Sequence, residues 1–222
     1  MGFSLEWNDI YGAQKNIIKW PWSDVVSLSY RYCNHLFEKG ASVLELGCGT
    51  GANIQFFKSN DFKYFGIDGN AEVIASLQSE YPEYKENIIC GDFTKNLGFD
   101  GYKFDLILDR AAITHNDTKA IIKTFDNIKS SLKVNGIFLA IDWFSTKHMD
   151  SKSGKIVDNF TRTMIPEGQF EGVGNVHFSD FEHLNDIFSD FKVLSMKEKV
   201  ISEFFLKKKD VFSAWDIVAQ KN

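Results

Sequence analysis

Three glycines directly after a carboxylate form the stretch of this sequence with the clearest chemical meaning. Residues 43–53 read VLELGCGTGAN, so an apolar run leads into Glu45 and then into Gly47, Gly49 and Gly51. Glycine adopts positive φ without steric cost and lets a ligand lie against the backbone. A helix-like stretch follows, and the first N–H groups of a helix have no partner within it. The pattern predicts a ligand cradle formed by a strand, a glycine turn and the start of a helix.

Two cofactors are held in cradles of this kind, a dinucleotide and S-adenosylmethionine, and Glu45 helps to distinguish them. Gly47-x-Gly49-x-x-Ala52 satisfies the loose dinucleotide pattern, and Asp68 follows about 20 residues on, where a ribose-binding acid is expected. A carboxylate beside the turn repels a pyrophosphate, whereas it attracts the sulfonium and ammonium groups of S-adenosylmethionine. The spacing therefore favours S-adenosylmethionine, and a tight turn without a ligand is the remaining alternative.

Length, charge and cysteine usage narrow the class of protein. A chain of 222 residues suits one α/β domain with a small lid. The formal charge of -5 and the lack of a long basic block argue against a nucleic-acid partner. Cys33, Cys48 and Cys90 have neither disulfide nor metal-ligand spacing, so no metal is expected. No signal peptide or membrane-length apolar run is present, which predicts a cytoplasmic protein without a membrane partner.

Apolar runs and amphipathic stretches alternate from residue 42 onward, which indicates a parallel sheet with helices on both faces. The predicted strands cover residues 42–46, 64–67, 87–90, 104–109, 136–141, 192–196 and 212–218. The predicted helices cover residues 23–37, 52–60, 71–81, 119–132 and 181–188, the last opened by a capping box from Ser179 to Glu182. We expect residues 1–40 to form an N-terminal cap helix region. Residues 41–222 form the main domain, with a substrate lid inserted at about 144–178.

Four acids stand at or near the ends of predicted strands, namely Glu45, Asp68, Asp92 and Asp109. Ligands of parallel α/β sheets bind at the carboxyl ends of the strands. The acids therefore predict a ligand site on one rim of the sheet, and four solvated loop acids are the alternative.

Five motifs in the same order resemble class I S-adenosylmethionine-dependent methyltransferases. They are VLELGCGTGAN, FGIDGN at 65–70, GDF at 91–93, FDLILDR at 104–110 and LKVNGIFLAI at 132–141. The resemblance implies a three-layer, Rossmann-like, seven-stranded sheet that is mostly parallel, with the last strand antiparallel. It also implies that Asp68 holds the ribose, that Asp92 and Phe93 hold the adenine, and that Asp109 lies beside the methyl group. The full set of expected cofactor-binding residues is Glu45, Gly47, Cys48, Gly49, Asp68, Gly69, Asp92, Phe93, Asp109 and Arg110.

A narrower resemblance concerns the acceptor. NIIKWPWSDVVSLSYRY near the N-terminus, DRAAITH at 109–115 and GVGNVHF at 172–178 resemble bacterial methyltransferases of surface-polysaccharide biosynthesis. This implies a small-molecule acceptor, a hydroxyl or amine of a sugar or sugar nucleotide. Asp109 is followed by Arg110 and Ala111 rather than by two prolines, which argues against a nucleobase acceptor. Arg110 either binds an anionic acceptor or pairs with an acid.

A hydroxyl acceptor requires a general base near the transferred methyl group. His115 and Asp109 are the catalytic candidates, and an exposed loop histidine is the alternative for His115. His148 and His177 bracket the expected lid and are candidates for acceptor contacts, or are structural.

Aromatic residues near the N-terminus are candidates to cover the bound cofactor. We expect Tyr11 and Trp20, together with Trp22, to close over it, while the two tryptophans also fit ordinary core positions. The sequence leaves two alternative functions open, a NAD(P)-dependent oxidoreductase and a non-catalytic S-adenosylmethionine-binding protein.

Overall fold

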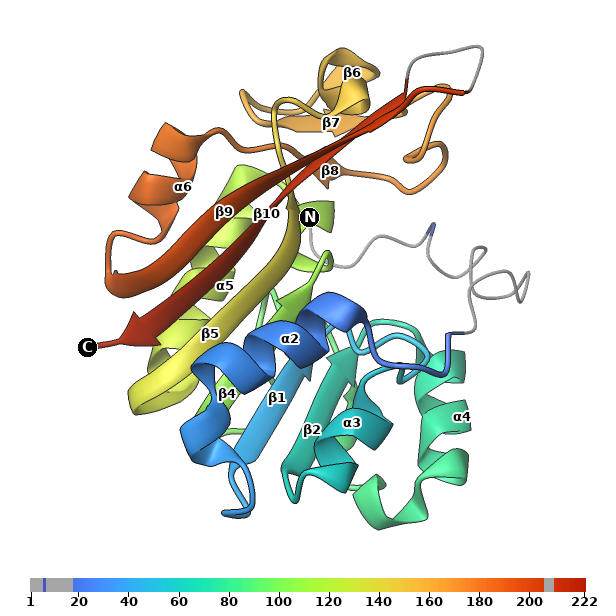
Figure 1. Cartoon of the computed structure of the whole chain (residues 1–222). Coiled ribbons are helices and arrows are strands. Elements are labelled where there is room, and N and C mark those ends of the chain that lie inside the picture. Colours follow the sequence, from blue (N-terminus) through green and yellow to red (C-terminus); the bar gives the residue numbers. More distant parts are fainter. Residues whose placement is uncertain (1–5, 7–17, 206–209) are drawn as a thin grey trace.

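The computed structural model describes residue 6, residues 18–205 and residues 210–222, and its centre is a sheet of seven strands (Figure 1). The order across the sheet is β3-β2-β1-β4-β5-β10-β9. The strands are β1 (Ser42–Leu46), β2 (Lys63–Asp68), β3 (Ile88–Cys90), β4 (Phe104–Arg110), β5 (Leu132–Phe144), β9 (Phe191–Glu203) and β10 (Asp210–Lys221).

Strand directions confirm the expected topology. Strands β1 to β5 pair in parallel, and the last strand, β10, pairs antiparallel with β5 and β9. The order of strands reverses at β1, because β2 lies on one side of it and β4 on the other. Ligands of open α/β sheets bind beside such a reversal.

Helices cover both faces of the sheet and give three layers. Apolar residues of α2 (Ser23–Tyr32), α3 (Ile54–Ser59) and α4 (Ala71–Glu80) share one core cluster with the sheet. Those of α5 (Thr118–Ser131) and α6 (Phe181–Ile187) share the cluster on the opposite face. Short 3-10 turns lie at Asn34–Leu36, Pro82–Tyr84, Ile113–His115 and Met149–Lys152. No described helix is long and apolar enough to cross a membrane.

Several boundaries differ from the sequence prediction, most of all at the C-terminal strands. Strands β9 and β10 form a hairpin of 13 and 12 residues that extends beyond the predicted segments. The edge strand β9 is largely exposed, so its polar side chains hide the strand from a search for apolar runs. Helix α2 ends at Tyr32, and α3 starts only at Ile54 because residues 52–53 belong to the preceding turn.

The predicted capping box of α6 is wrong by one residue. Asp180, not Ser179, is the N-cap, and its Oδ1 accepts a hydrogen bond of 2.9 Å from the His183 N–H. Ser179 is fully buried, where its Oγ accepts a 2.9 Å hydrogen bond from Trp143 Nε1. The Ser179 hydroxyl therefore binds the buried Trp143 instead of capping helix α6.

The insertion at 144–178 folds into a small substructure next to the β9–β10 hairpin (Figure 1). Its strands β6 (Lys155–Ile156), β7 (Thr161–Thr163) and β8 (Val176–His177) form an antiparallel sheet in the order β6-β7-β8. We call its apolar core the lid cluster, which comprises Phe144, Ile165, Phe170, Val173, Val176 and Phe178, with Ala214 from β10.

Candidate functional site

The glycine turn after β1 is closed by backbone hydrogen bonds and by Asp68. The N–H of Gly47 donates to the carbonyl of Ile67 at 2.8 Å, and the N–H of Gly49 donates to Asp68 Oδ2 at 3.0 Å. Gly47 has φ of +66°, and a Cβ there would lie 2.3 Å from Ala112 Cβ. The position therefore requires glycine for its conformation and for its space. This close-fitting backbone cradle suits a ligand that lies on the main chain.

Glu45 lies beneath this turn and is held by two side chains. Its Oε1 accepts from Asn53 Nδ2 at 2.7 Å and its Oε2 from the Tyr64 hydroxyl at 2.6 Å. Burial raises the pKa of Glu45 to about 7, although both hydrogen bonds oppose the shift. The residue joins β1 to β2 and to the start of α3. Its carboxylate is only partly ionised near neutral pH, which weakens the charge argument made from the sequence.

A cavity of about 450 Å³ opens beside the glycine turn. Ten of the predicted site residues line it: Glu45, Gly47, Cys48, Gly49, Asp68, Gly69, Asp92, Phe93, Arg110 and His115. Three of the four predicted rim acids, Glu45, Asp68 and Asp92, thus share the wall of one cavity, and their role in ligand binding stays a prediction. Asp109, Trp20, His148 and His177 are not among its lining residues, and Tyr11 lies outside the described residues.

Asp68 and Asp92 are positioned differently on this wall. Asp68 is buried, and its Oδ1 accepts from the Asn70 N–H at 2.9 Å while its Oδ2 binds the Gly49 N–H. Burial raises the pKa of Asp68. Asp92 is partly exposed, and its Oδ1 accepts from the Thr94 N–H and from the Thr94 hydroxyl at 2.6 Å. Each carboxylate oxygen has two acceptor sites, so both acids keep capacity for a ligand donor.

Asp109 shapes the loop after β4 from behind the cavity wall. Its Oδ1 accepts from the N–H groups of Ala112 at 3.1 Å and Ile113 at 2.9 Å. Complete burial raises the pKa of Asp109 to about 7. These bonds hold the 3-10 turn that carries His115. A direct role of Asp109 in catalysis or cofactor binding stays a prediction.

His115 extends from this turn to the lid side of the cavity. Its Nδ1 lies 3.1 Å from the carbonyl oxygen of Asn175, which can only accept, so Nδ1 carries the proton and Nε2 the lone pair. Burial lowers the pKa of His115 to about 4, and the hydrogen bond to Asn175 opposes this only in part. The imidazole is neutral at physiological pH and is oriented by its backbone partner.

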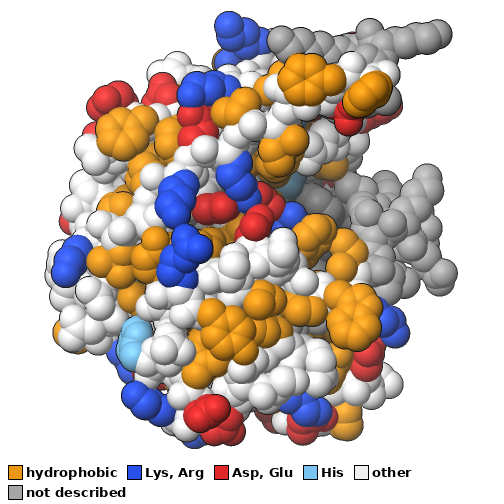
Figure 2. Space-filling view, viewed as in Figure 1, with side chains coloured by type: hydrophobic (Ala, Val, Ile, Leu, Met, Phe, Trp, Pro, Cys, Tyr) orange, Lys and Arg blue, Asp and Glu red, His pale blue; other side chains and the backbone are white. Residues whose placement is uncertain are grey.

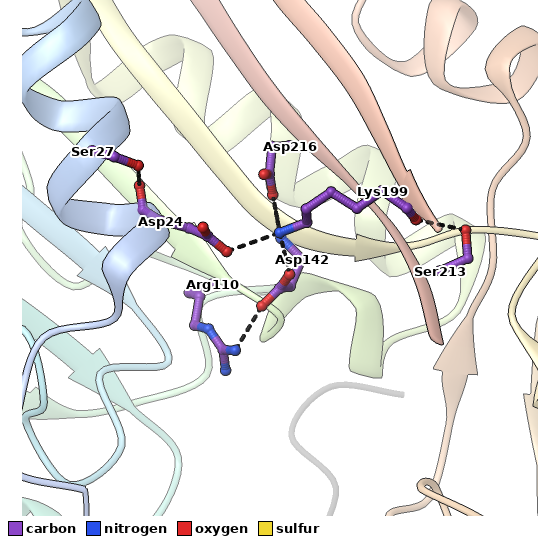
Figure 3. A network of polar contacts seen from close by, with 7 residues as sticks. All are labelled: Asp24, Ser27, Arg110, Asp142, Lys199, Ser213 and Asp216. Atoms are coloured by element: carbon purple, nitrogen blue, oxygen red, sulfur yellow. Dashed lines mark hydrogen bonds and ion pairs between the residues drawn. The ribbon is translucent and has the colours of Figure 1, made fainter. Parts of the chain in front are cut away.

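A charged network on the other side of the cavity includes Arg110, for which the sequence left pairing with an acid as one alternative; Lys199 as its centre was not predicted (Figure 3). Arg110 donates from Nη2 to Asp142 Oδ2 at 2.6 Å, and its guanidinium lies 3.5 Å from the Trp22 ring centroid. Lys199 Nζ contacts Asp142 at 2.7 Å and both Asp24 and Asp216 at 2.9 Å. The three acids are close enough to suit a metal ion, but the Lys199 ammonium lies among them as their counter-charge.

Three of the remaining predicted residues have other surroundings. His148 and His177 are buried in or beside the lid, where His148 Nε2 contacts Gln169 and His177 Nδ1 contacts Thr161. Trp20 is 79% exposed, whereas Trp22 lines the cavity. The contacts of both histidines are those of structural residues, and their role in acceptor binding stays a prediction.

Comparisons with known proteins agree with this geometry. Residues 43–136 match the family described as "Methyltransferase domain". Ribosomal RNA small subunit methyltransferase A from two Porphyromonas gingivalis strains is 39% identical over 71 residues, 31% of this chain and 27% of that protein. The chain thus matches about a quarter of the length of these curated relatives.

Three solved structures share the fold at low sequence identity. PH0226 protein from Pyrococcus horikoshii is 16% identical, with a TM-score of 0.66 over 100% of both chains. An S-adenosylmethionine-dependent methyltransferase from Clostridium acetobutylicum is 16% identical, with a TM-score of 0.64 over 97% of this chain and 96% of that one. A Burkholderia thailandensis 1,6-didemethyltoxoflavin-N1-methyltransferase, solved with 1,6-didemethyltoxoflavin and S-adenosylhomocysteine, is 16% identical, with a TM-score of 0.63 over 98% and 84%.

The cofactor expected from the sequence fits the residues present. Gly47 and Gly51 leave no space for a side chain, and Asp68 at the end of β2 and Asp92 after β3 offer acceptors to a ribose and an adenine amine. The sequence match thus assigns a methyltransferase domain to residues 43–136, and the glycine cradle within these residues fits S-adenosylmethionine.

Proposed function

We propose that this protein transfers a methyl group from S-adenosylmethionine to a hydroxyl or amine of a small molecule. One observation carries the proposal: a single cavity joins the glycine turn and the acids of the sheet rim to His115 and the lid. The cofactor, when bound, supplies a methyl group already activated by its sulfonium. The protein then has to place the acceptor, exclude water and accept a proton.

His115 is the residue that we assign to proton removal. It lines the cavity, its Nε2 is the basic nitrogen of a neutral ring, and Asn175 fixes the ring orientation. A general base has to be deprotonated at the working pH, and burial ensures this for His115. The base is required only for a hydroxyl acceptor, because a neutral amine attacks with its own lone pair.

The lid formed by residues 144–178 is proposed as the substrate cover. Phe144 and Phe170 of the lid cluster and Gln169 beside them line the same cavity as the glycine turn. The resemblance to surface-polysaccharide methyltransferases makes a sugar or sugar nucleotide one candidate acceptor. The Burkholderia relative is named for a different small molecule, 1,6-didemethyltoxoflavin. An acceptor panel therefore has to include both kinds of compound.

A nucleic-acid acceptor is the alternative that the ribosomal RNA methyltransferase match raises. The net charge of -5 disfavours it, because binding a phosphate backbone requires clustered Lys and Arg. Figure 2 shows acidic and basic side chains interspersed on one face of the described residues, with no broad basic surface on that face. A small-molecule acceptor fits these charges better.

Calorimetry with the purified protein tests the cofactor. We expect binding of S-adenosylmethionine and S-adenosylhomocysteine and no heat with NADH, and the reverse pattern would replace the methyltransferase with an oxidoreductase. Turnover is then measured as S-adenosylhomocysteine formed with a library of hydroxyl and amine acceptors. Cofactor binding with no turnover on any acceptor would favour a non-catalytic binding protein.

A further inference from the structure

Arg110 is the only lysine or arginine among the described residues that line the cavity. Four acids share this lining, namely Glu45, Asp68, Asp92 and Asp142. S-adenosylmethionine and S-adenosylhomocysteine each carry an ammonium and a carboxylate at the same end of the molecule. The acids of the wall attract the ammonium and repel the carboxylate, so the carboxylate requires a cation close to them. Within the described part of the wall, Arg110 is the residue that provides one.

The fold places Arg110 beside the glycine turn. Arg110 is the last residue of β4, and Leu46, the last residue of β1, pairs with Asp109 of β4. The turn after β1 and the loop after β4 are therefore neighbours at the rim of the sheet, where a Cβ at Gly47 would lie 2.3 Å from Ala112 Cβ. A ligand that lies on the glycine turn can thus extend to Arg110 within the same cavity.

The guanidinium of Arg110 is held in place and still has hydrogen-bond donors to offer. Asp142 Oδ2 accepts from its Nη2 at 2.6 Å (Figure 3), and the centroid of the Trp22 ring lies 3.5 Å from its central carbon. A guanidinium has five N–H donors, and Nε of Arg110 is buried without a hydrogen-bond partner among the described residues. Buried donors are paired in nearly all protein structures, so this nitrogen points to an acceptor that a ligand supplies.

We infer that Arg110 binds the carboxylate of the cofactor, and that Trp22 and Asp142 position its guanidinium. The inference rests on the proposed use of S-adenosylmethionine and assigns a partner to one of its charged groups. An anionic acceptor is the other source of such a group. The carboxylate of the cofactor fits better, because it is covalently joined to the ammonium that the acids of the same wall attract.

Two ligands that differ by one carboxylate test the inference on the wild-type protein. Calorimetry compares S-adenosylhomocysteine with its decarboxylated analogue, which keeps the amine and has a net positive charge. The acids of the wall alone favour the analogue, whereas a carboxylate site at Arg110 favours S-adenosylhomocysteine. We expect S-adenosylhomocysteine to bind at least about tenfold more tightly. Equal or tighter binding of the analogue would overturn the inference. Binding of neither compound would refute the proposed function itself.

An arginine variant then locates the carboxylate. Arg110→Gln keeps a donor for Asp142 but removes the cation. We expect its affinity for S-adenosylhomocysteine to fall at least about tenfold, while its affinity for the analogue stays the same or rises. Arg31→Gln, at an exposed position on α2 outside the cavity lining, should keep the wild-type preference.

Two results with Arg110→Gln would contradict the assignment. A preference for S-adenosylhomocysteine as large as that of the wild type would show that the carboxylate is bound elsewhere and would leave Arg110 to an anionic acceptor. Equal losses of affinity for both ligands would show a structural role of the arginine. Circular dichroism checks that the variant folds, and the comparison of the two ligands on the wild type decides independently of it.

Discussion

At the scale of single residues, the assignment of His115 as general base makes a kinetic prediction. His115→Gln keeps a donor for the Asn175 carbonyl but removes the basic nitrogen. We expect kcat with a hydroxyl acceptor to fall by about 10²–10⁴, with S-adenosylmethionine affinity nearly constant. Steady-state kinetics and calorimetry on one preparation check this. A variant with wild-type kcat would show that the proton leaves by another route.

The pH dependence of the reaction provides a second test. Burial lowers the pKa of His115 to about 4, so the imidazole stays neutral and able to accept a proton at every pH above that value. As the pH falls through 4, protonation removes the base. We therefore expect kcat/KM of the wild type to show no loss between pH 8 and about pH 5 from this group. An inflection near the ordinary histidine value of about 6.5 would contradict the buried position.

Asp68 is the residue for which a cofactor role is easiest to measure. If both ribose hydroxyls donate to its carboxylate, each charge-assisted bond contributes about 1.5–3 kcal/mol. Asp68→Ala should weaken S-adenosylhomocysteine binding at least about tenfold. Asp68 also accepts from Gly49 and Asn70, so circular dichroism has to confirm the fold. Glu86→Ala, at an exposed acid outside the cavity, should bind normally.

The sequence predicts the acids at the strand ends better than it predicts the contacts around Arg110. Glu45, Asp68 and Asp92 were predictable as neighbours because each lies at or near the carboxyl end of an apolar strand, and strand ends meet at one rim. The contact of Arg110 with Asp142 and Trp22 was not, because it depends on which distant side chains the fold brings together. Histidine positions alone also do not separate His115, which lines the cavity, from His177, which does not.

At the scale of elements, helix α5 depends on its N-cap for the position of the adjoining turn. Asp117 Oδ1 accepts from the Ala120 N–H at 2.8 Å. Asp117→Ala should lower the free energy of unfolding by about 1 kcal/mol, since it leaves a helix donor without a partner. Asp126→Ala, at an exposed position within the same helix, should change it much less. Urea denaturation measures both, and equal effects would contradict the cap.

Element length determines which segments the sequence reveals. Each of the five parallel strands contains a short apolar run, and the search for such runs found all five, although β5 is longer than its predicted segment. The lid strands β6, β7 and β8 have two or three residues each, too few for any periodicity. The insertion was recognisable only as a long irregular segment. Its internal sheet depends on contacts that no local pattern encodes.

At the scale of the whole molecule, Lys199 joins elements from both ends of the chain. Its ammonium is the shared counter-charge of Asp24 on α2, Asp142 on β5 and Asp216 on β10 (Figure 3). Lys199→Met should destabilise the protein by about 2–4 kcal/mol, because three neighbouring carboxylates lose their cation. Lys197→Met, at an exposed position two residues earlier, should have little effect.

The pH dependence of the stability lost in Lys199→Met distinguishes the loss of the ammonium charge from the loss of side-chain packing. Burial raises the pKa of Asp216, so its protonation as the pH falls relieves the repulsion among the acids; the deficit of Lys199→Met should therefore be largest near pH 8 and shrink toward pH 4. Thermal unfolding at both pH values checks the trend. A deficit that stays constant with pH would indicate that the lysine acts through packing alone.

The separation of 175 residues between Asp24 and Lys199 has a consequence for the biosynthesis of the protein. The ribosome releases the N-terminus first. Asp24 on α2 and Asp142 on β5 are therefore made before the lysine that joins them, and Asp216 is made after it. A nascent chain interrupted before Lys199 contains the glycine turn with Glu45, Asp68 and Asp92, but Asp142 still lacks its ammonium partner. The ion pairs of Lys199 with Asp24 and Asp142 thus form only after residue 199 has been made, and its pair with Asp216 only after residue 216.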